Sequence, residues 1–343
     1  MAPAATEPTH GDGIVIADTT VLTLRKVLVS ESSPLASRFR ALFSLKHLAS
    51  QSPPTAQTIP AIEAIAAAFA SPSALLKHEL AYCLGQTRNF AAVPSLTQVL
   101  KDNSEDPMCR HEAAEALGAL GHEGSLALLR QYRDDASEQV VVRETCEIAV
   151  SRIEWEHSTA RAHERLKNSD FASIDPAPPM SMLDRKSAAT EVAALEKTLL
   201  DDTLPLFVRY RAMFALRDLA SPPDLPSAVP AVLSLAKGLM DKSALFRHEI
   251  AFVFGQLSHP ASIPALITAL SDQKEESMVR HEAAEALGSL GDEDGVEDVL
   301  KRFLNDPEQV VRESVIVALD MAEFEKAGEK EYATVPVIAA VAA

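Results

Sequence analysis

Cysteine, glycine and aromatic residues are scarce in this chain, and each shortage excludes a class of protein. Three cysteines cannot form a disulfide framework, which favours a reducing compartment. Twelve glycines and 5% aromatic residues in 343 positions weigh against a β-sandwich, a β-barrel or a glycine-rich nucleotide fold. The sequence has no run of 18 apolar residues to span a bilayer, so no membrane partner is expected. The first residues lack a secretion signal, which makes the cytoplasm the expected location, with the nucleus in addition.

Positive charge is also in short supply. The chain has 32 lysines and arginines against 49 aspartates and glutamates, a formal charge of −17. Nucleic-acid affinity depends on clustered basic residues, so no nucleic-acid partner is expected. An acidic surface instead favours neutral or cationic partners. The hydrophobic content of 47% is enough for a core, and the abundance of alanine and leucine indicates a helical protein.

The chain contains an internal duplication. Segments about half a chain apart are nearly identical, with an offset of 170 residues to within one position. The matching pairs are RHEAAEALG at 110–118 and 280–288, KHELAYCLGQ at 77–86 and RHEIAFVFGQ at 247–256, and SRFRALFSLKHLA at 37–49 and VRYRAMFALRDLA at 208–220. Repetition on this scale is not chance, so we expect two halves with the same fold.

A shorter period divides each half. A basic residue opens an amphipathic segment every 32 to 39 residues, and a second amphipathic stretch precedes each of these segments. The basic residues are Arg38, Lys77, Arg110, Arg143, Arg209, Arg247, Arg280 and Arg312. The Val-Arg openings and Ala-Leu-Gly endings resemble HEAT-type repeats, close to the phycobilisome-lyase class. We therefore predict an all-α fold, an α-solenoid of eight HEAT-like helical hairpins in two pseudo-symmetric four-repeat halves.

Composition suggests where these halves begin and end. Residues 154–190 include SIDPAPPMSM and several charges, which is typical of a proline-stiffened linker. The predicted organisation is a flexible N-terminal tail at 1–17, an N-terminal half at 18–153, a linker at 154–190, a C-terminal half at 191–326 and a C-terminal tail at 327–343.

Four of the eight repeats contain a His-Glu pair directly after the basic residue. The pairs are His78-Glu79, His111-Glu112, His248-Glu249 and His281-Glu282, each with a glycine seven residues beyond the histidine. At the same positions the other four repeats have Phe39-Arg40, Glu144-Thr145, Tyr210-Arg211 and Glu313-Ser314. The scaffold therefore does not require His-Glu. Two further pairs, His122-Glu123 and His163-Glu164, lack this context and are interpreted as coincidental.

A lone His-Glu pair would have a structural explanation, because a glutamate in a first helical turn complements the helix dipole. Four pairs in register favour a metal site instead. Neighbouring solenoid helices lie about 8–10 Å apart, so equivalent positions on consecutive second helices face one another. Two histidines and a glutamate from adjacent repeats can then converge on one ion at about 2.0–2.2 Å. We expect one such site in each half, because consecutive repeats are nearest neighbours.

The donor set points to particular metals. The candidate ligands are imidazoles and carboxylates, without a thiolate. Two histidines and one carboxylate per ion, with open coordination positions, are the pattern of non-haem Fe(II) oxygen chemistry. Zinc is the alternative and would favour hydrolysis through a bound water. The HExxH zinc motif is absent, because Tyr82 and Glu115 stand four residues after His78 and His111. Glu115 and Glu285 lie one turn beyond two of the histidines, where they either orient the imidazoles or face solvent.

Eight HEAT-type repeats with His-Glu in the middle two of each half closely resemble the deoxyhypusine hydroxylase family, over residues 20–325. The resemblance implies a di-iron mono-oxygenase that uses O₂ to hydroxylate deoxyhypusine on translation initiation factor 5A, completing hypusine. It implies iron ligation by His78, His111, Glu112, His248, His281 and Glu282. Glu79 and Glu249 are then further ligands or contacts to the substrate amines, and all eight residues match the family pattern. Deoxyhypusine is a long polycation, which suits an acidic protein.

Two other functions are consistent with helical repeats. A non-catalytic scaffold would bind partners on its concave face, with metal absent or purely structural. A lyase or isomerase like the phycobilisome-type repeats would bind a tetrapyrrole. Neither explains why His-Glu is restricted to the central repeats, and we therefore expect an enzyme.

Overall fold

A computed structural model of the chain describes residues 19–164, 169–180 and 188–327. Every regular element in these ranges is helical. The α-helices are α1 (Thr19–Val29), α2 (Leu35–Ala49), α3 (Thr58–Ala66), α4 (Ala74–Gly85), α5 (Val93–Lys101), α6 (Pro107–Ala119), α7 (Leu126–Asp134), α8 (Val140–Glu156), α9 (Thr159–His163), α10 (Ala188–Leu200), α11 (Leu206–Ala220), α12 (Ala228–Lys237), α13 (Ala244–Leu257), α14 (Ile263–Ser271), α15 (Ser277–Gly288), α16 (Val296–Lys301) and α17 (Gln309–Ala327). The predicted N-terminal tail at 1–17 lies outside the described residues, as does all of the predicted C-terminal tail at 327–343 except Ala327, which ends α17.

Successive helices pair as hairpins. Apart from the short α9, the described helices form eight pairs, from α1 with α2 to α16 with α17, and the partners in each pair contact one another. The second helices of consecutive pairs also pack together, as α4 does on α6 and α13 on α15. The prediction of an all-α solenoid is confirmed. None of the described helices is both long and apolar enough to cross a bilayer.

The basic residues that mark the repeat period tie the two helices of a hairpin together. Four of them are buried arginines, and each donates from Nε to the backbone carbonyl ten residues earlier, near the end of the preceding helix. The pairs are Arg38 to Leu28 at 2.8 Å, Arg110 to Leu100 at 3.1 Å, Arg209 to Leu199 at 2.9 Å and Arg280 to Leu270 at 3.0 Å. Each also binds a carboxylate, so these arginines stabilise the fold.

The glycines seven residues beyond the motif histidines allow consecutive second helices to approach closely. A Cβ on Gly85 would lie 2.8 Å from Cα of Ala116 in α6, and one on Gly118 would lie 2.8 Å from Cβ of Ala149 in α8. Such distances exclude a side chain. The close approach brings the inward faces of neighbouring helices within reach of one another.

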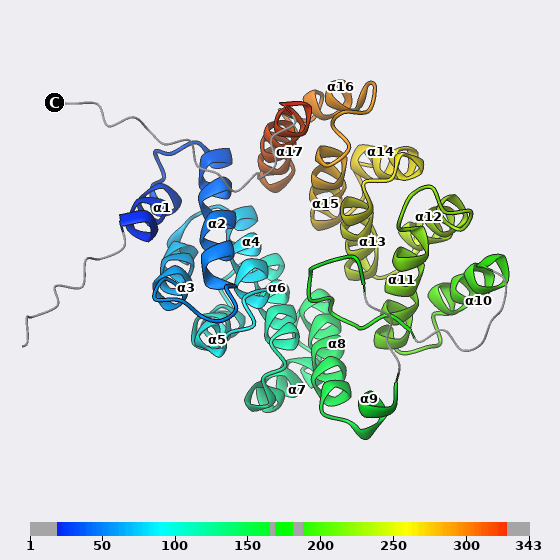
Figure 1. The fold of residues 1–343 in the computed structure, drawn as a ribbon, viewed down its shortest axis with the longest axis horizontal. Coiled ribbons are helices and arrows are strands. Elements are labelled where there is room, and N and C mark those ends of the chain that lie inside the picture. The colour runs from blue at the N-terminus through cyan, green and yellow to red at the C-terminus, as the bar shows by residue number, and fades with distance from the viewer. Residues whose placement is uncertain (1–18, 165–168, 181–187, 328–343) are drawn as a thin grey trace, which may run out of the picture.

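The two halves close into a ring (Figure 1), in which the second helices surround the centre. At one junction α8 packs on α11 and α13, and at the other α17 packs on α2 and α4. Each junction repeats the same bond, because Ser243 donates to Glu144 at 2.6 Å and Ser73 donates to Glu313 at 2.6 Å. Arg40 and Asp320 add a two-bond ion pair between α2 and α17, at 2.9 Å.

Residues 169–180, which we call the strap, join the two halves across the ring (Figure 1). The side chain of Gln86 bonds to both backbone groups of Ile174, while Gln256, its counterpart in the second half, donates to Ser173. The strap belongs to the predicted linker at 154–190. Within that range α8 continues to Glu156 and α10 begins at Ala188. The proposed domain boundaries remain a prediction.

Candidate metal centre

The four motif histidines meet at the centre of the ring. The ring centroids of His78, His111, His248 and His281 lie 5.2–5.6 Å apart in five pairs. All four imidazoles are buried. They come from the inner helices α4, α6, α13 and α15, each from the first half of its helix.

Local sequence explains this placement. Ser73 and Ser243 cap α4 and α13, accepting from the backbone N–H groups of Leu76 and Phe246. Asp106 caps α6 in the same way, followed by Pro107 in the first turn. These caps fix where α4, α6 and α13 begin. Helix α15 begins at the equivalent position without a side-chain cap, so each motif histidine is the fifth residue of its helix. The four His-Glu pairs are thereby held at the same level of the ring.

Each half supplies an equivalent set of ligand atoms. In the first half, His78 Nε2 lies 3.3 Å from Glu112 Oε2, and in the second His248 Nε2 lies 3.3 Å from Glu282 Oε2. In the second half, His281 joins His248 and Glu282 in one group of possible ligands, and in the first half His111 is grouped with Glu112 and Glu115. The groups also adjoin each other, because donor atoms of His78, His111 and His248 all lie within 4.8 Å of one another. The arrangement can hold two neighbouring metal ions.

The buried polar atoms here need a partner that protein groups do not provide. Among the described residues, both ring nitrogens of His78, His111 and His248 are buried without a hydrogen bond, as are His281 Nε2 and Glu249 Oε1. Leaving such groups unsatisfied costs about 1–3 kcal/mol each. Metal ligation would satisfy several of these nitrogens at once, so the residues fit the implied metals.

The charges of the centre lead to the same inference. Burial raises the pKa of Glu79, Glu112 and Glu282 to about 8, and neighbouring carboxylates add to the effect. Burial lowers the pKa of His248 to about 3, with a further contribution from His78. Burial also lowers the pKa of His111 and His281, so these three imidazoles are neutral, with lone pairs available to a metal. The carboxylates ionise readily only when cations lie among them.

Glu79 and Glu249 lie beside the two ligand groups and line a cavity of about 220 Å³ between the halves. Glu115 and Glu285 line the same cavity and are half-buried, which places them at the centre and not on an outer helix face. Glu285 accepts a hydrogen bond from Ser314 at 3.0 Å and lies 3.6 Å from His281 Nδ1. This position suits the orienting role considered from the sequence.

Sequence reasoning missed several residues of the cavity wall. Tyr82 and Phe252 stand four residues after His78 and His248, and their rings meet across the halves at 5.8 Å. Their shared position in the duplicated motif was a signal that could have found them. Phe43 and Lys46 of α2 also line the cavity and had no such signal. Cys83 and Cys109 are buried free thiols, consistent with packing.

Comparison with known proteins supports the same family. Residues 59–150 and 229–320 match the family described as HEAT repeats. The chain is 73% identical over 326 residues to a deoxyhypusine hydroxylase of Phaeosphaeria nodorum, covering 95% of this chain and 98% of the relative. It is 76% identical over 317 residues to the Aspergillus niger enzyme of that name, covering 92% and 93%. The solved structure of human deoxyhypusine hydroxylase in complex with glycerol matches with a TM-score of 0.77 and 45% identity, covering 89% of this chain and 96% of that one.

Proposed function

The chain belongs to the deoxyhypusine hydroxylase family, and we propose that it hydroxylates deoxyhypusine on translation initiation factor 5A, using two iron ions and O₂. The observation that carries the metal assignment is the pair of equivalent His-His-Glu groups in a buried centre whose imidazole nitrogens lack partners. Two histidines and one carboxylate with open positions suit non-haem iron, and a hydroxylation favours iron over zinc because zinc has no redox chemistry. Iron bound there supplies the redox chemistry that O₂-dependent hydroxylation requires.

The ligands of the first iron would be His78, His111 and Glu112. Those of the second would be His248, His281 and Glu282. Neutral imidazoles need lose no proton to bind a metal, and the closeness of His248 to His78 and His111 would place the two ions near one another. Ser314 and Glu285 would hold the ring of His281 in place.

Glu79 and Glu249 would bind the substrate amines. They face the cavity from opposite halves, so they can contact a cationic chain from two sides. Hydrogen bonds between ionised carboxylates and ammonium groups are stronger than hydrogen bonds between neutral groups. The rings of Tyr82 and Phe252 line the cavity in contact with each other and would shield the alkyl part of the side chain from water.

The protein substrate is expected to present a cationic side chain, because this chain has a formal charge of −17 and attracts positively charged groups. The three buried free thiols suit the cytoplasm, or the nucleus in addition, as the place of action.

Metal analysis of freshly purified protein tests the proposal. We expect close to two irons per chain, and hydroxylation of factor 5A carrying deoxyhypusine. His111→Ala should lower the iron count and abolish hydroxylation. His122→Ala is the matched control, because His122-Glu123 lies outside the centre and its ring bonds to Ser125. Full activity in iron-free protein, or zinc in place of iron in active protein, would overturn the assignment.

A further inference from the structure

The central cavity is lined differently at the two ends of the pseudo-symmetric ring. On the α2 side, Phe39, Phe43 and Lys46 line it. Their counterparts in the duplicated sequence are Tyr210, Phe214 and Arg217 of α11, all 0% exposed. The duplicated scaffold therefore opens the cavity beside α2 and fills the corresponding place beside α11.

Lys46 and Arg217 show what separates the two ends. Arg217 is neutralised by Asp175 of the strap, with both bonds at 2.8 Å, and also by Asp218. The Lys46 ammonium lies over the ring of Tyr82, 4.9 Å from its centroid, and none of the described carboxylates forms an ion pair with it. Its charge is therefore available to an incoming group at the mouth of the cavity.

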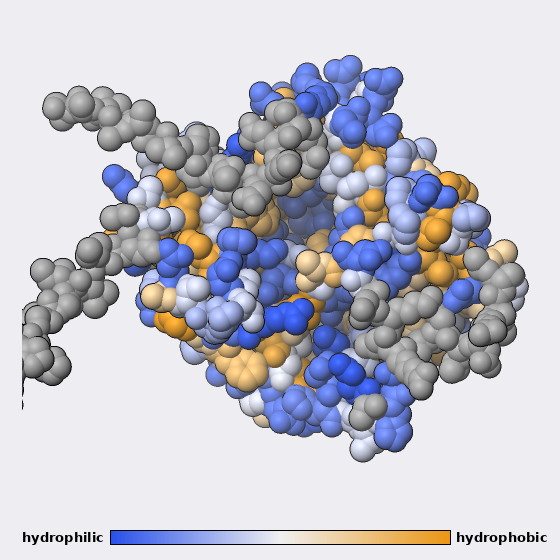
Figure 2. Space-filling view, viewed as in Figure 1, coloured by the Kyte–Doolittle hydropathy of each residue, from blue (hydrophilic) through white to orange (hydrophobic). Residues whose placement is uncertain are grey.

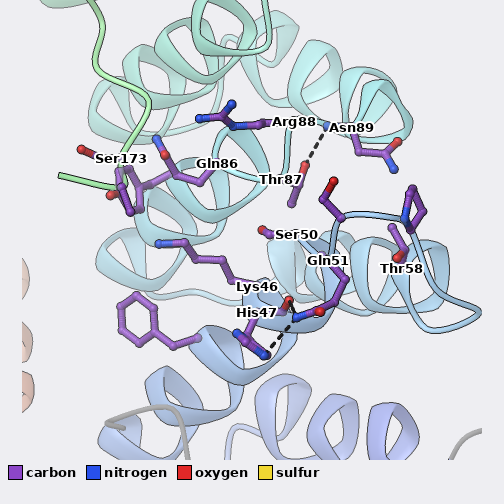
Figure 3. A pocket seen from close by; sticks show the side chains of 16 residues that line it. Lys46, His47, Ser50, Gln51, Thr58, Gln86, Thr87, Arg88, Asn89 and Ser173 are labelled. Carbon is purple, nitrogen blue, oxygen red and sulfur yellow. Dashed lines mark hydrogen bonds between the residues drawn. The ribbon is translucent and has the colours of Figure 1, made fainter. Parts of the chain in front are cut away.

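An outer pocket of about 590 Å³ adjoins this mouth (Figure 3), between the C-terminal ends of α2 and α4. Phe43, Lys46 and Tyr82 line both spaces, so Lys46 stands at the neck between them. Figure 3 shows the Lys46 side chain extending into the outer pocket between Gln86 and His47. Viewed as in Figure 1, the molecule is hollowed near its middle, inside the ring of helices, where hydrophilic residues gather (Figure 2).

The two spaces have opposite electrostatic character. Six glutamates line the inner cavity: Glu79, Glu112, Glu115, Glu249, Glu282 and Glu285. Among its described lining residues the outer pocket has no carboxylate, and it has two cations, Lys46 and Arg88. Its remaining polar groups are mostly hydroxyls and amides, including Ser50, Gln51 and Asn89. This lining suits main-chain amides and carbonyls, whereas the inner cavity suits amines.

We propose that the outer pocket binds the polypeptide segment that carries the modified side chain, with Lys46 donating hydrogen bonds to its main-chain carbonyls at the neck. The polyamine-like side chain then extends past Tyr82 into the glutamate-lined cavity. A free polyamine has no carbonyl for Lys46 and meets its positive charge instead. Lys46 thus makes the site specific for a protein-borne side chain over free polyamines. The inference rests on the proposed substrate class.

Lys46→Met tests this role, because methionine retains the length of the side chain and removes its charge. We expect the KM for factor 5A carrying deoxyhypusine to rise about tenfold or more, because the variant loses a hydrogen bond from a charged donor. The kcat and the iron content should stay unchanged. Inhibition by free spermidine should become several-fold stronger. Lys46→Arg should restore both values. Lys101→Met is the control for charge, because Lys101 is exposed on α5 away from both spaces.

Several outcomes would overturn the inference. One is an unchanged KM and an unchanged spermidine inhibition in Lys46→Met protein with normal iron content. Another is a fall in kcat at constant KM, which would place Lys46 in the chemical step. Direct calorimetric binding of the deoxyhypusine protein separates this test from the proposed function. If wild type binds that protein but does not hydroxylate it, the proposed function fails, while weaker binding by Lys46→Met still supports the docking role.

Discussion

Replacing Arg280 by methionine should destabilise the protein strongly while leaving the metal ligands in place. Arg280 is one of the arginines that mark the repeat period, and it directly precedes His281. Its guanidinium donates to Leu270 O at 3.0 Å and to both carboxylate oxygens of Asp306, one of them at 3.0 Å. The two side chains are 2% and 1% exposed, so the pair is fully buried.

The structure sets the expected size of the effect. Removing one partner of a buried ion pair leaves the other charge uncompensated, which costs about 3–5 kcal/mol. The exposed pair Arg130–Glu154 provides a matched control, because its side chains are 46% and 51% exposed. Arg130→Met should cost no more than about 1 kcal/mol. Adding Asp306→Asn to Arg280→Met should recover much of the loss, because the amide leaves no buried charge.

The effect should also depend on pH. Burial tends to raise the pKa of Asp306, but hydrogen bonds from Arg280 and the Glu308 backbone N–H outweigh it and lower the pKa. The resulting stabilisation is present above the ordinary aspartate pKa and is lost as the pH falls through the folded-state pKa. Without Arg280, burial dominates and the pKa rises, so the native variant takes up a proton. The difference in stability between variant and wild type should therefore shrink between about pH 7 and pH 4.

Urea unfolding followed by circular dichroism at several pH values measures these differences. Wild type, both single variants and the double variant are compared under one condition, with iron content checked in each. If Arg280→Met costs no more than Arg130→Met at neutral pH, the buried pair does not stabilise the fold. A cost that stays constant or grows as the pH falls would refute the electrostatic explanation.

Two further predictions concern packing and the metal. Gly85→Ala should destabilise the protein by about 1–3 kcal/mol, because the new Cβ would lie 2.8 Å from Ala116. Gly255→Ala should be nearly neutral or stabilising, because its Cβ would lie 3.4 Å from Ala286. Equal costs in urea titrations would contradict this packing argument. Removing iron with a chelator should lower the thermal midpoint, because a ligand that binds only the folded state stabilises it by about 2.7 kcal/mol at roughly one hundred times its Kd. An unchanged midpoint after complete removal of iron would show that the centre does not contribute to stability.

Much of the fold could be predicted because its signals are local. Helix spacing, the basic residue that opens each second helix and the glycine beyond each motif are all short-range patterns in the sequence. The eight site residues could be identified by comparing the repeats, since the other four repeats have the same helical pattern without His-Glu. The structure brings all eight to one centre, and their assignment to iron stays a prediction.

The surroundings of the centre could not be predicted in this way. Lys46 and Arg217 occupy equivalent positions and are both basic, yet one faces the cavity and the other is buried. The difference arises from Asp175 of the strap, more than forty residues from Arg217 in sequence but bonded to it. A repeat pattern contains no information about such a contact.

The sequence by itself determined the repeat architecture, the donor atoms and their equivalence between halves, because these depend on spacing within one hairpin or between adjacent ones. Only the tertiary structure decided that the two halves meet face to face. That arrangement depends on small rotations accumulated along the solenoid and on contacts between its ends, such as Arg40 with Asp320, 280 residues apart. The same closure decided that the cavity opens beside α2 and is filled beside α11.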